Sequence, residues 1–167
     1  MKDLKLIPAN QTDIGKISEL ASVIWNQHYR AIIGQPQIDY MLNLMYSEQT
    51  ISEQLNSKQH LYYLINSNDC TVGFISVHEE KKGDWFLHKF YIDQTKASKG
   101  IGTFTFEILK QLLKPNKITL TVNRQNHKSI NFYFKLGFKI EGVANFDIGN
   151  NFEMNDFVMV WEMRNAE

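Results

Sequence analysis

Residues 96–113, KASKGIGTFTFEILKQLL, place two glycines, Gly100 and Gly102, directly before a run of apolar residues with helical spacing. The start of a helix exposes unpaired backbone N–H groups and the positive end of the helix dipole, and glycines in front of it let an anion approach the backbone closely. The stretch therefore favours a phosphate site at a strand-to-helix junction. On spacing alone, a simple turn from a strand into a helix is an equally good interpretation.

The flanking sequence alternates between strand and helix patterns. Apolar, β-branched and aromatic runs predict strands at residues 4–9, 60–66, 71–79, 85–92, 117–122, 138–143 and 156–163. Helical spacing, capping residues and glycine or proline stops predict helices at residues 14–25, 38–45, 47–55, 101–113 and 126–136. Strands outnumber helices and βα units lie in the middle, so we expect an α+β fold with a mixed, mostly antiparallel sheet of roughly six or seven strands and about four helices.

Composition limits the class of protein. The 167 residues are 43% hydrophobic, which suits one compact domain spanning residues 1–167. Lysine plus arginine and aspartate plus glutamate both total 18, so no overall charge attracts nucleic acid or an anionic membrane. Cys70 is the only cysteine, which excludes an intramolecular disulfide and a thiolate metal cluster. With no signal peptide or spanning segment in view, we expect a cytoplasmic protein that binds neither nucleic acid nor membrane.

The glycine stretch does not fit two other anion-binding motifs. A P-loop needs G-x-x-x-x-G-K-[ST], and a dinucleotide fingerprint needs a third glycine where this chain has Thr105. Instead, KASKGIGTF resembles the pyrophosphate loop of the GCN5-related N-acetyltransferase (GNAT) superfamily, [RQ]-x-x-G-x-[GA], with Ala97 at the position of the family's arginine or glutamine. Residues 126–138, NHKSINFYFKLGF, resemble the family's second signature. The resemblance covers about residues 87–138, and the chain looks most like small bacterial acetyltransferases of the polyamine or small-amine type.

The resemblance implies the fold of the acyl-CoA N-acyltransferases, acetyl-CoA as the cosubstrate and direct acetyl transfer to a primary amine. It also implies that the pantetheine arm pairs with the strand at residues 90–92 and that the pyrophosphate lies on the glycine loop. Whether Lys96 or Lys99 compensates for Ala97 stays open. The cofactor contacts that the resemblance implies are Phe90, Tyr91, Ile92, Lys96, Ser98, Lys99, Gly100, Ile101, Gly102, Thr103, Asn126 and Ser129.

Two residues are candidates for proton transfer. The family pattern makes Tyr133 the general acid that protonates the departing CoA thiolate, and a phenol is a competent donor that stays protonated near neutrality. His88 is the candidate base because it lies in the strand beside the expected cleft, although a lone histidine is more often a packed or surface residue. No metal site is expected, because His60, His78 and His127 show no ligand spacing with one another.

The acceptor is predicted less directly. The resemblance places the acceptor pocket near His28 and Tyr29, at the end of the first helix. Asp147 and Glu153 could hold a cationic amine, although solvated turn charges are the simpler interpretation. We therefore expect a small amine such as a polyamine, while a peptide or protein acceptor and a non-catalytic acyl-CoA-binding or sensory module stay open. The oligomeric state, including a homodimer, also stays open.

Overall fold

The computed structural model describes residues 3–57, 60–96 and 98–163. Ala97, which departs from the pattern of the pyrophosphate loop, lies outside the described residues. Within these three ranges, no helix is both long enough and apolar enough to cross a bilayer.

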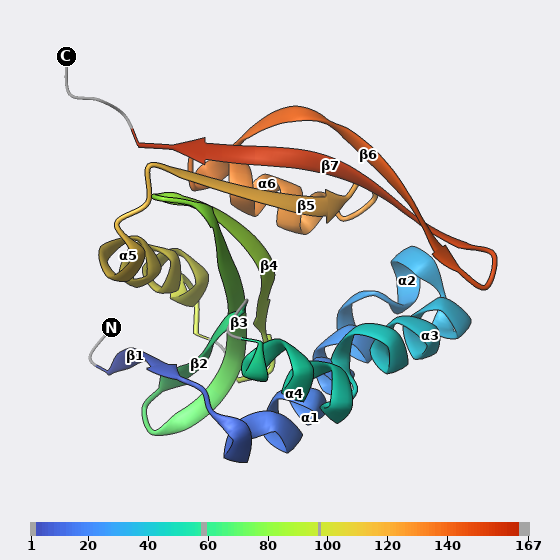
Figure 1. The fold of residues 1–167 in the computed structure, drawn as a ribbon, viewed down its shortest axis with the longest axis horizontal. Helices are drawn as coiled ribbons and strands as arrows, with labels where there is room; N and C mark the ends of the chain where they lie inside the picture. The colour runs from blue at the N-terminus through green and yellow to red at the C-terminus, as the bar shows by residue number, and fades with distance from the viewer. Residues whose placement is uncertain (1–2, 58–59, 97, 164–167) are drawn as a thin grey trace.

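Seven strands form one sheet in the order β1-β2-β3-β4-β5-β7-β6 (Figure 1). Every neighbouring pair is antiparallel except β4 and β5, which are parallel. The sheet therefore confirms the predicted α+β class with a mixed, mostly antiparallel sheet. The strands are β1 (Leu4–Pro8), β2 (Leu61–Ser67), β3 (Cys70–Lys81), β4 (Asp84–Ile92), β5 (Lys117–Asn123), β6 (Lys139–Gly149) and β7 (Phe152–Glu162).

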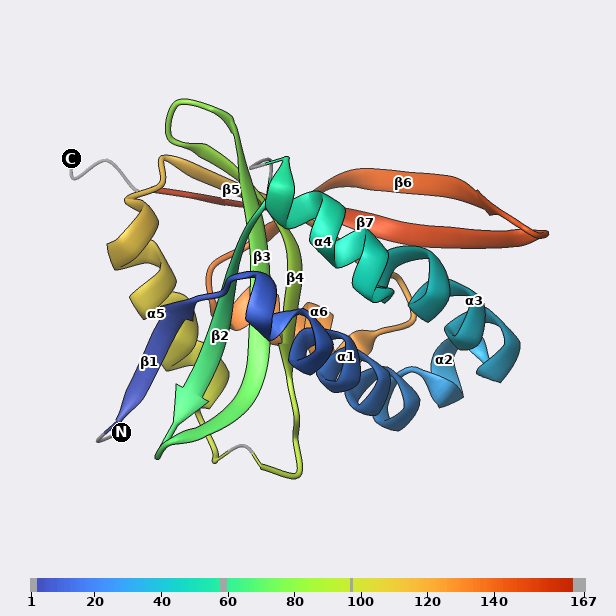
Figure 2. The same cartoon turned by 60° about the horizontal axis from the view of Figure 1, so that its bottom comes forward.

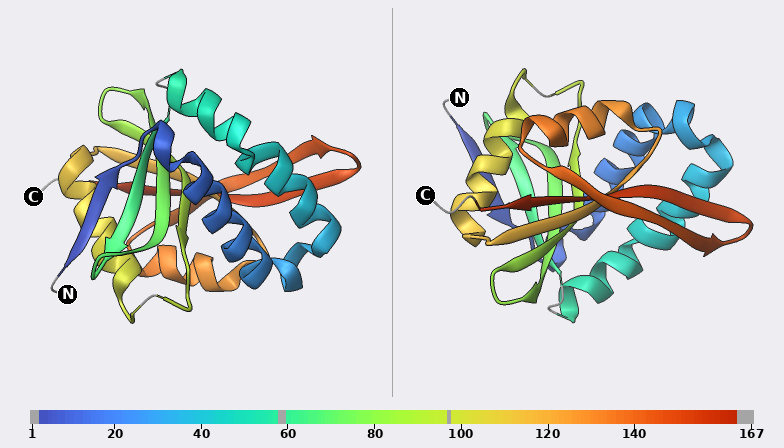
Figure 3. Two further views of the ribbon diagram at one scale, coloured as in Figure 1. Left: turned by 90° about the horizontal axis from the view of Figure 1, so that it is seen from below. Right: turned by 90° about the horizontal axis from the view of Figure 1, so that it is seen from above.

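Helices cover both faces of the sheet (Figure 3). The face that carries Phe74 packs against Trp25 and Ile38, so α1, α3 and α4 cover it (Figure 2). The opposite face packs against Phe106 and Ile130, so α5 and α6 cover it. The helices are α1 (Ile14–His28), α2 (Arg30–Ile33), α3 (Gln35–Tyr46), α4 (Glu48–Asn56), α5 (Ile101–Leu113) and α6 (His127–Lys135), and a 3-10 turn at Gln11–Asp13 precedes α1.

A bulge in β4 interrupts the alternation of its side chains. Ser76 of β3 pairs with Lys89, but the next residue of β3, Val77, pairs with Leu87, so His88 has no partner of its own. Such an extra residue bends the strand and re-aims a side chain. His88 and Lys89, although consecutive, both face the side of the sheet that α1 and α4 cover.

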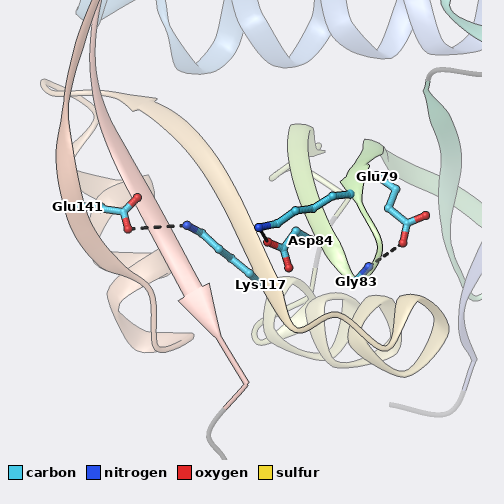
Figure 4. A network of polar contacts seen from close by, with 6 residues as sticks. Glu79, Gly83, Asp84, Lys117 and Glu141 are labelled. Carbon is cyan, nitrogen blue, oxygen red and sulfur yellow. Dashed lines mark hydrogen bonds and ion pairs between the residues drawn. The ribbon is translucent and has the colours of Figure 1, made fainter.

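Strands β4 and β5 pair at one end only. Residues 84–86 lie beside residues 117–119, and the ladder between the two strands stops there. At the same end of β5, Lys117 reaches across the sheet to Glu141 of β6, with Nζ and Oε1 3.7 Å apart (Figure 4). Beyond this ladder the two strands diverge around a cavity, which leaves one edge of β4 unpaired toward β5.

The β6–β7 hairpin extends beyond the other strands to α3 (Figure 1). The Tyr40 hydroxyl donates to the carbonyl of Ile148 at 2.6 Å, and the Gln37 side-chain amide donates to the carbonyl of Glu153 at 2.9 Å. These contacts fix the hairpin against the helical layer. The hairpin therefore brings residues of β7 to the space beside the diverging strands.

Candidate active site

A cavity of about 1030 Å³ lies at the diverging halves of β4 and β5. Small-molecule sites typically measure about 300–1,000 Å³, so this cavity can hold a large cosubstrate together with a small acceptor. It runs from the loop before α5 to α1 and α3. The predicted site residues that line it are His28, Tyr29, His88, Phe90, Tyr91, Ile92, Ser98, Lys99, Gly100, Ile101, Gly102, Thr103, Ser129 and Tyr133, whereas Lys96, Asn126, Asp147 and Glu153 are not lining residues.

The glycine loop forms one end of the cavity. Gly100 is the N-cap of α5 with φ 87°, in the left-handed region that favours glycine. A Cβ on Gly102 would lie 3.0 Å from the Phe132 ring, so this glycine lets α5 pack closely on α6. The glycines thus serve the turn and the packing, and both also line the cavity. The backbone at the start of α5 is therefore placed where an anion could approach it.

Lysines add positive charge to the cavity. Lys99 lines it, whereas Lys96 pairs with the buried carboxylate of Asp93 at 3.6 Å. Helix α6 contributes Lys128 and Lys135 to the lining, two residues that the glycine motif does not single out. Cations together with a helix N-terminus suit a ligand that carries phosphates.

Aromatic residues build the other end of the cavity. Residues 90–92 of β4 all line it, and the Tyr46 hydroxyl donates to the Tyr91 hydroxyl at 3.0 Å. Trp25 and Tyr29 of α1 stack with their ring centroids 4.4 Å apart. Burial raises the pKa of Tyr29 to about 12, so its phenol is neutral at pH 7.

Asn126 links α6 to the end of α1. Its Oδ1 accepts from the Ser129 amide at 3.2 Å and thereby caps α6, and the same atom lies 3.2 Å from His28 Nε2. Its side-chain amide donates to the Tyr29 hydroxyl at 3.4 Å. Asn126 is 1% exposed, so it positions His28 and Tyr29 from beneath the cavity wall. Burial lowers the pKa of His28, which favours its neutral form.

Tyr133 of α6 lines the cavity. It lies close enough to Tyr29 of α1 for the two phenols to interact electrostatically. Burial raises the pKa of Tyr133 above its ordinary value, and the nearby Tyr29 adds to this shift. Within the described ranges, no group hydrogen-bonds the Tyr133 hydroxyl. The phenol is therefore protonated at pH 7 and can donate to a ligand in the cavity.

His88 lies in a cluster of three histidines that come from separate segments. Its ring centroid is 4.3 Å from that of His60 and 4.7 Å from that of His78. Burial, followed by the charges of the neighbouring histidines and Lys89, lowers the pKa of His88 to about 3. Its imidazole is neutral at pH 7 and accepts a proton weakly. Ligand spacing in the sequence does not reveal this cluster, because only the folded sheet brings the three histidines together.

The charged groups toward the acceptor end differ from those expected. Asp147 and Glu153 pair across the β6–β7 hairpin, outside the cavity lining, whereas Asp156 of β7 lines the cavity and is 3% exposed. Burial raises the pKa of Asp156, against the opposing effects of Thr121 and Arg124.

Lys89 supplies a buried positive charge on the α4 side of the cavity. Its Nζ donates to Gln54 Oε1 at 3.1 Å and lies 5.3 Å and 5.2 Å from the ring centroids of Tyr46 and Tyr62. Burial lowers the pKa of Lys89 to about 8. The cavity therefore carries opposite charges on two different walls.

The sequence matches the profile of the acetyltransferase (GNAT) domain over residues 33–157. Because this match spans more than half of the chain, the chain belongs to the GNAT acetyltransferase family. An uncharacterized N-acetyltransferase of Mycobacterium tuberculosis is 45% identical over 47 residues, which are 28% of this chain and 30% of that protein. The chain thus matches less than a third of the length of the curated relatives that it resembles.

Solved structures share the fold at low sequence identity. PaiA N-acetyltransferase from Thermoplasma acidophilum, solved in complex with coenzyme A, has a TM-score of 0.81 at 21% identity, over 96% of this chain and 99% of that one. SpeG, the spermidine/spermine N-acetyltransferase of Vibrio cholerae, has a TM-score of 0.67 at 18% identity, over 97% and 95%. The ribosomal-protein-S18-alanine N-acetyltransferase of Escherichia coli has a TM-score of 0.69 at 16% identity, over 99% and 97%. These likenesses support the GNAT fold, and the acceptors named for the second and third of these proteins differ from each other.

Proposed function

We propose that this protein is an N-acetyltransferase that moves the acetyl group of acetyl-CoA directly to a primary amine. The observation that carries the proposal is one continuous cavity with the glycine loop at one end and the protonated phenol of Tyr133 in its wall. A module that only binds acyl-CoA would need the loop but no positioned proton donor. The family membership and the coenzyme A bound to the PaiA relative support the same conclusion.

The residues that hold acetyl-CoA follow from the lining of the cavity. Backbone groups at Gly100 and Gly102 and the Lys99 ammonium would bind the pyrophosphate, with the α5 dipole favouring its negative charge. The unpaired edge of β4 at residues 90–92 offers backbone groups to the amide-containing pantetheine arm. Asn126 contributes indirectly, since it holds Tyr29 and the start of α6 in place.

Acetyl transfer to a cationic amine requires three proton movements. The reacting ammonium must lose a proton to become nucleophilic, its nitrogen must lose another as the bond to the acetyl carbon forms, and the departing CoA sulfur must gain one. Tyr133 donates to the sulfur in this proposal. His88 stays the predicted base, although its Nε2 faces His78 Nδ1 and its lowered pKa makes it a weak proton acceptor. A His88→Gln variant with unchanged kcat would exclude it.

The acceptor in this proposal is a small cationic amine of the polyamine type. Asp156 provides a buried carboxylate, and the stacked rings of Trp25 and Tyr29 provide π-faces, both of which favour a cation. Asp147 and Glu153 stay candidates for a more distant amino group of a long polyamine. Lys89 opposes a cation on its own wall and instead favours an acceptor that carries a carboxylate.

A panel of amines distinguishes these acceptors. Purified protein and acetyl-CoA are incubated with polyamines, monoamines, amino acids and peptides, and free thiol release is followed. Turnover with polyamines supports the proposal, whereas turnover only with peptides or amino acids replaces the acceptor and retains the reaction. Thiol release no faster than in the absence of any amine, together with measurable acetyl-CoA binding, would instead indicate an acyl-CoA-binding module.

A further inference from the structure

His60, His78 and His88 bring three imidazoles together from the segment before β2, from β3 and from β4. One ligand nitrogen from each ring lies within 4.8 Å of the other two. A tetrahedral zinc ion with Zn–N bonds of about 2.0–2.1 Å needs its nitrogens about 3.3 Å apart, so small rotations of the rings would bring them into range. His60 and His78 are partly buried, and His60 and His88 line the cavity.

The contacts within the cluster place two ring nitrogens opposite each other. His78 Nδ1 and His88 Nε2 face each other at short distance. One of these nitrogens can carry a hydrogen and donate it to the other, and without that hydrogen both lone pairs are available to a metal ion. Proteins use the same neutral nitrogens to bind zinc and other borderline transition metals.

A buried serine orients one of the rings. Ser76 is 0% exposed, and its Oγ lies 3.0 Å from His60 Nδ1. If Nδ1 carries the hydrogen of this bond, Nε2 of His60 is left as the ligand atom. Such an outer partner fixes the tautomer and the ring orientation of metal-binding histidines.

We propose that His60, His78 and His88 form a binding site for a divalent transition-metal ion of the zinc type. Three imidazoles leave a fourth coordination position for water or a ligand, and this position lies beside the cavity because two of the three residues line it. Lys89, the residue after His88, brings a positive charge nearby that weakens the binding of a cation. Its ammonium is held by Gln54 and by the rings of two tyrosines.

Metal titration of the whole chain tests the proposal without acetyl-CoA or amine, so the result does not depend on the proposed acetyl transfer. Protein without an affinity tag is freed of metal with a chelator and titrated with Zn²⁺ by calorimetry. We expect one Zn²⁺ per chain. His78→Gln should weaken binding by more than the roughly 10- to 100-fold that loss of an outer-shell partner costs, and Ser76→Ala by an amount within that range.

His127→Gln is the matched control, because His127 is exposed at the start of α6 and outside the cluster. Its zinc affinity should equal that of the parent. The histidine ring resonances of the unaltered protein give a second measurement that needs no folded variant. Zn²⁺ should shift the resonances of three of the five histidines and leave His28 and His127 unchanged. Absence of saturable binding at one ion per chain, or equal affinity of the parent and a folded His78→Gln, would overturn the proposal.

Discussion

Replacing Tyr133 by phenylalanine removes the proposed proton donor and leaves the ring that packs against Phe132 and Phe138. General acids typically contribute about 10²- to 10⁴-fold to the rate, which is about 2.7–5.4 kcal/mol at 1.36 kcal/mol for each factor of ten. Burial raises the pKa of Tyr133 further above that of a thiol, so full proton transfer from the phenol is uphill. We therefore expect kcat to fall by about 10²- to 10³-fold, the lower half of the range.

The assay separates chemistry from binding and folding. Thiol release at saturating acetyl-CoA and amine gives kcat, calorimetry gives the acetyl-CoA affinity, and urea unfolding gives stability. Only kcat should change appreciably, because no described residue hydrogen-bonds the hydroxyl that is lost. Tyr63→Phe is the control: Tyr63 is 8% exposed in the same core and does not line the cavity. If the kcat of Tyr133→Phe stays within about threefold of the parent value, water or another residue delivers the proton.

Three further predictions concern the two ends of the cavity. Gly100→Ala and Gly137→Ala should each lower the free energy of unfolding by about 1–2 kcal/mol, because both glycines have positive φ (87° and 94°). Only Gly100→Ala should also weaken acetyl-CoA binding, measured by calorimetry. Asp156→Asn should raise KM for a cationic amine about tenfold or more, since hydrogen bonds to charged groups contribute about 1.5–3 kcal/mol. The control Asp69→Asn, on an exposed turn, should leave KM unchanged. An equal KM for both variants would remove Asp156 from the acceptor site. Burial raises the pKa of Asp156 in the folded state above the ordinary value of 3.8, so its ionisation destabilises the fold as pH rises through the range above 3.8. In urea unfolding, the stability of Asp156→Asn relative to the parent should therefore increase over that range. A parallel pH dependence of the two proteins would contradict the shift.

Local sequence signals predicted most of the secondary structure. Ser47 caps α4 as expected, with its Oγ accepting from the Thr50 amide at 3.2 Å. The turn at residues 67–70 has Asn68 and Asp69 at positive φ, a conformation that these residues tolerate. Each of these features depends on neighbours in the sequence, and for that reason the sequence alone was sufficient.

Elements that depend on distant contacts were predicted less well. The predicted strand at residues 138–143 stops short of the observed end of β6 at Gly149, although Ala144, Phe146 and Ile148 alternate with Asn145 and Asp147. Its pairing with β7 and the bond from Tyr40 to the Ile148 carbonyl hold it in place. The short α2 was not predicted either, since the break at Gly34 masks it. Contacts with residues distant in the sequence thus set the extent of β6.

The candidate site likewise has residues that continuous sequence motifs identify and residues that only the fold brings together. The loop and Tyr133 were identified because they belong to continuous motifs, and the structure places both on one cavity. The histidine cluster depends on a bulge, which shifts the register of β4 by one residue and brings His88 beside His78. No spacing rule in the sequence specifies such a bulge. Asp156 was not singled out from the sequence, because the alternation of β7 alone does not say which acidic residue faces the cavity, and the roles of Asp147 and Glu153 stay predictions.

Two buried charges at this cavity reinforce the interpretation that it is a site of chemistry. Burial disfavours the charged forms of both Asp156 and Lys89, as their shifted pKa values indicate, so each lowers the stability of the fold at neutral pH. They line different walls and are held by different partners, so neither compensates the other as an ion pair. A chain that needed only to fold would be more stable with apolar residues at both positions. Groups of this kind concentrate where a ligand has to be recognised by charge, and both line the cavity that also contains Tyr133.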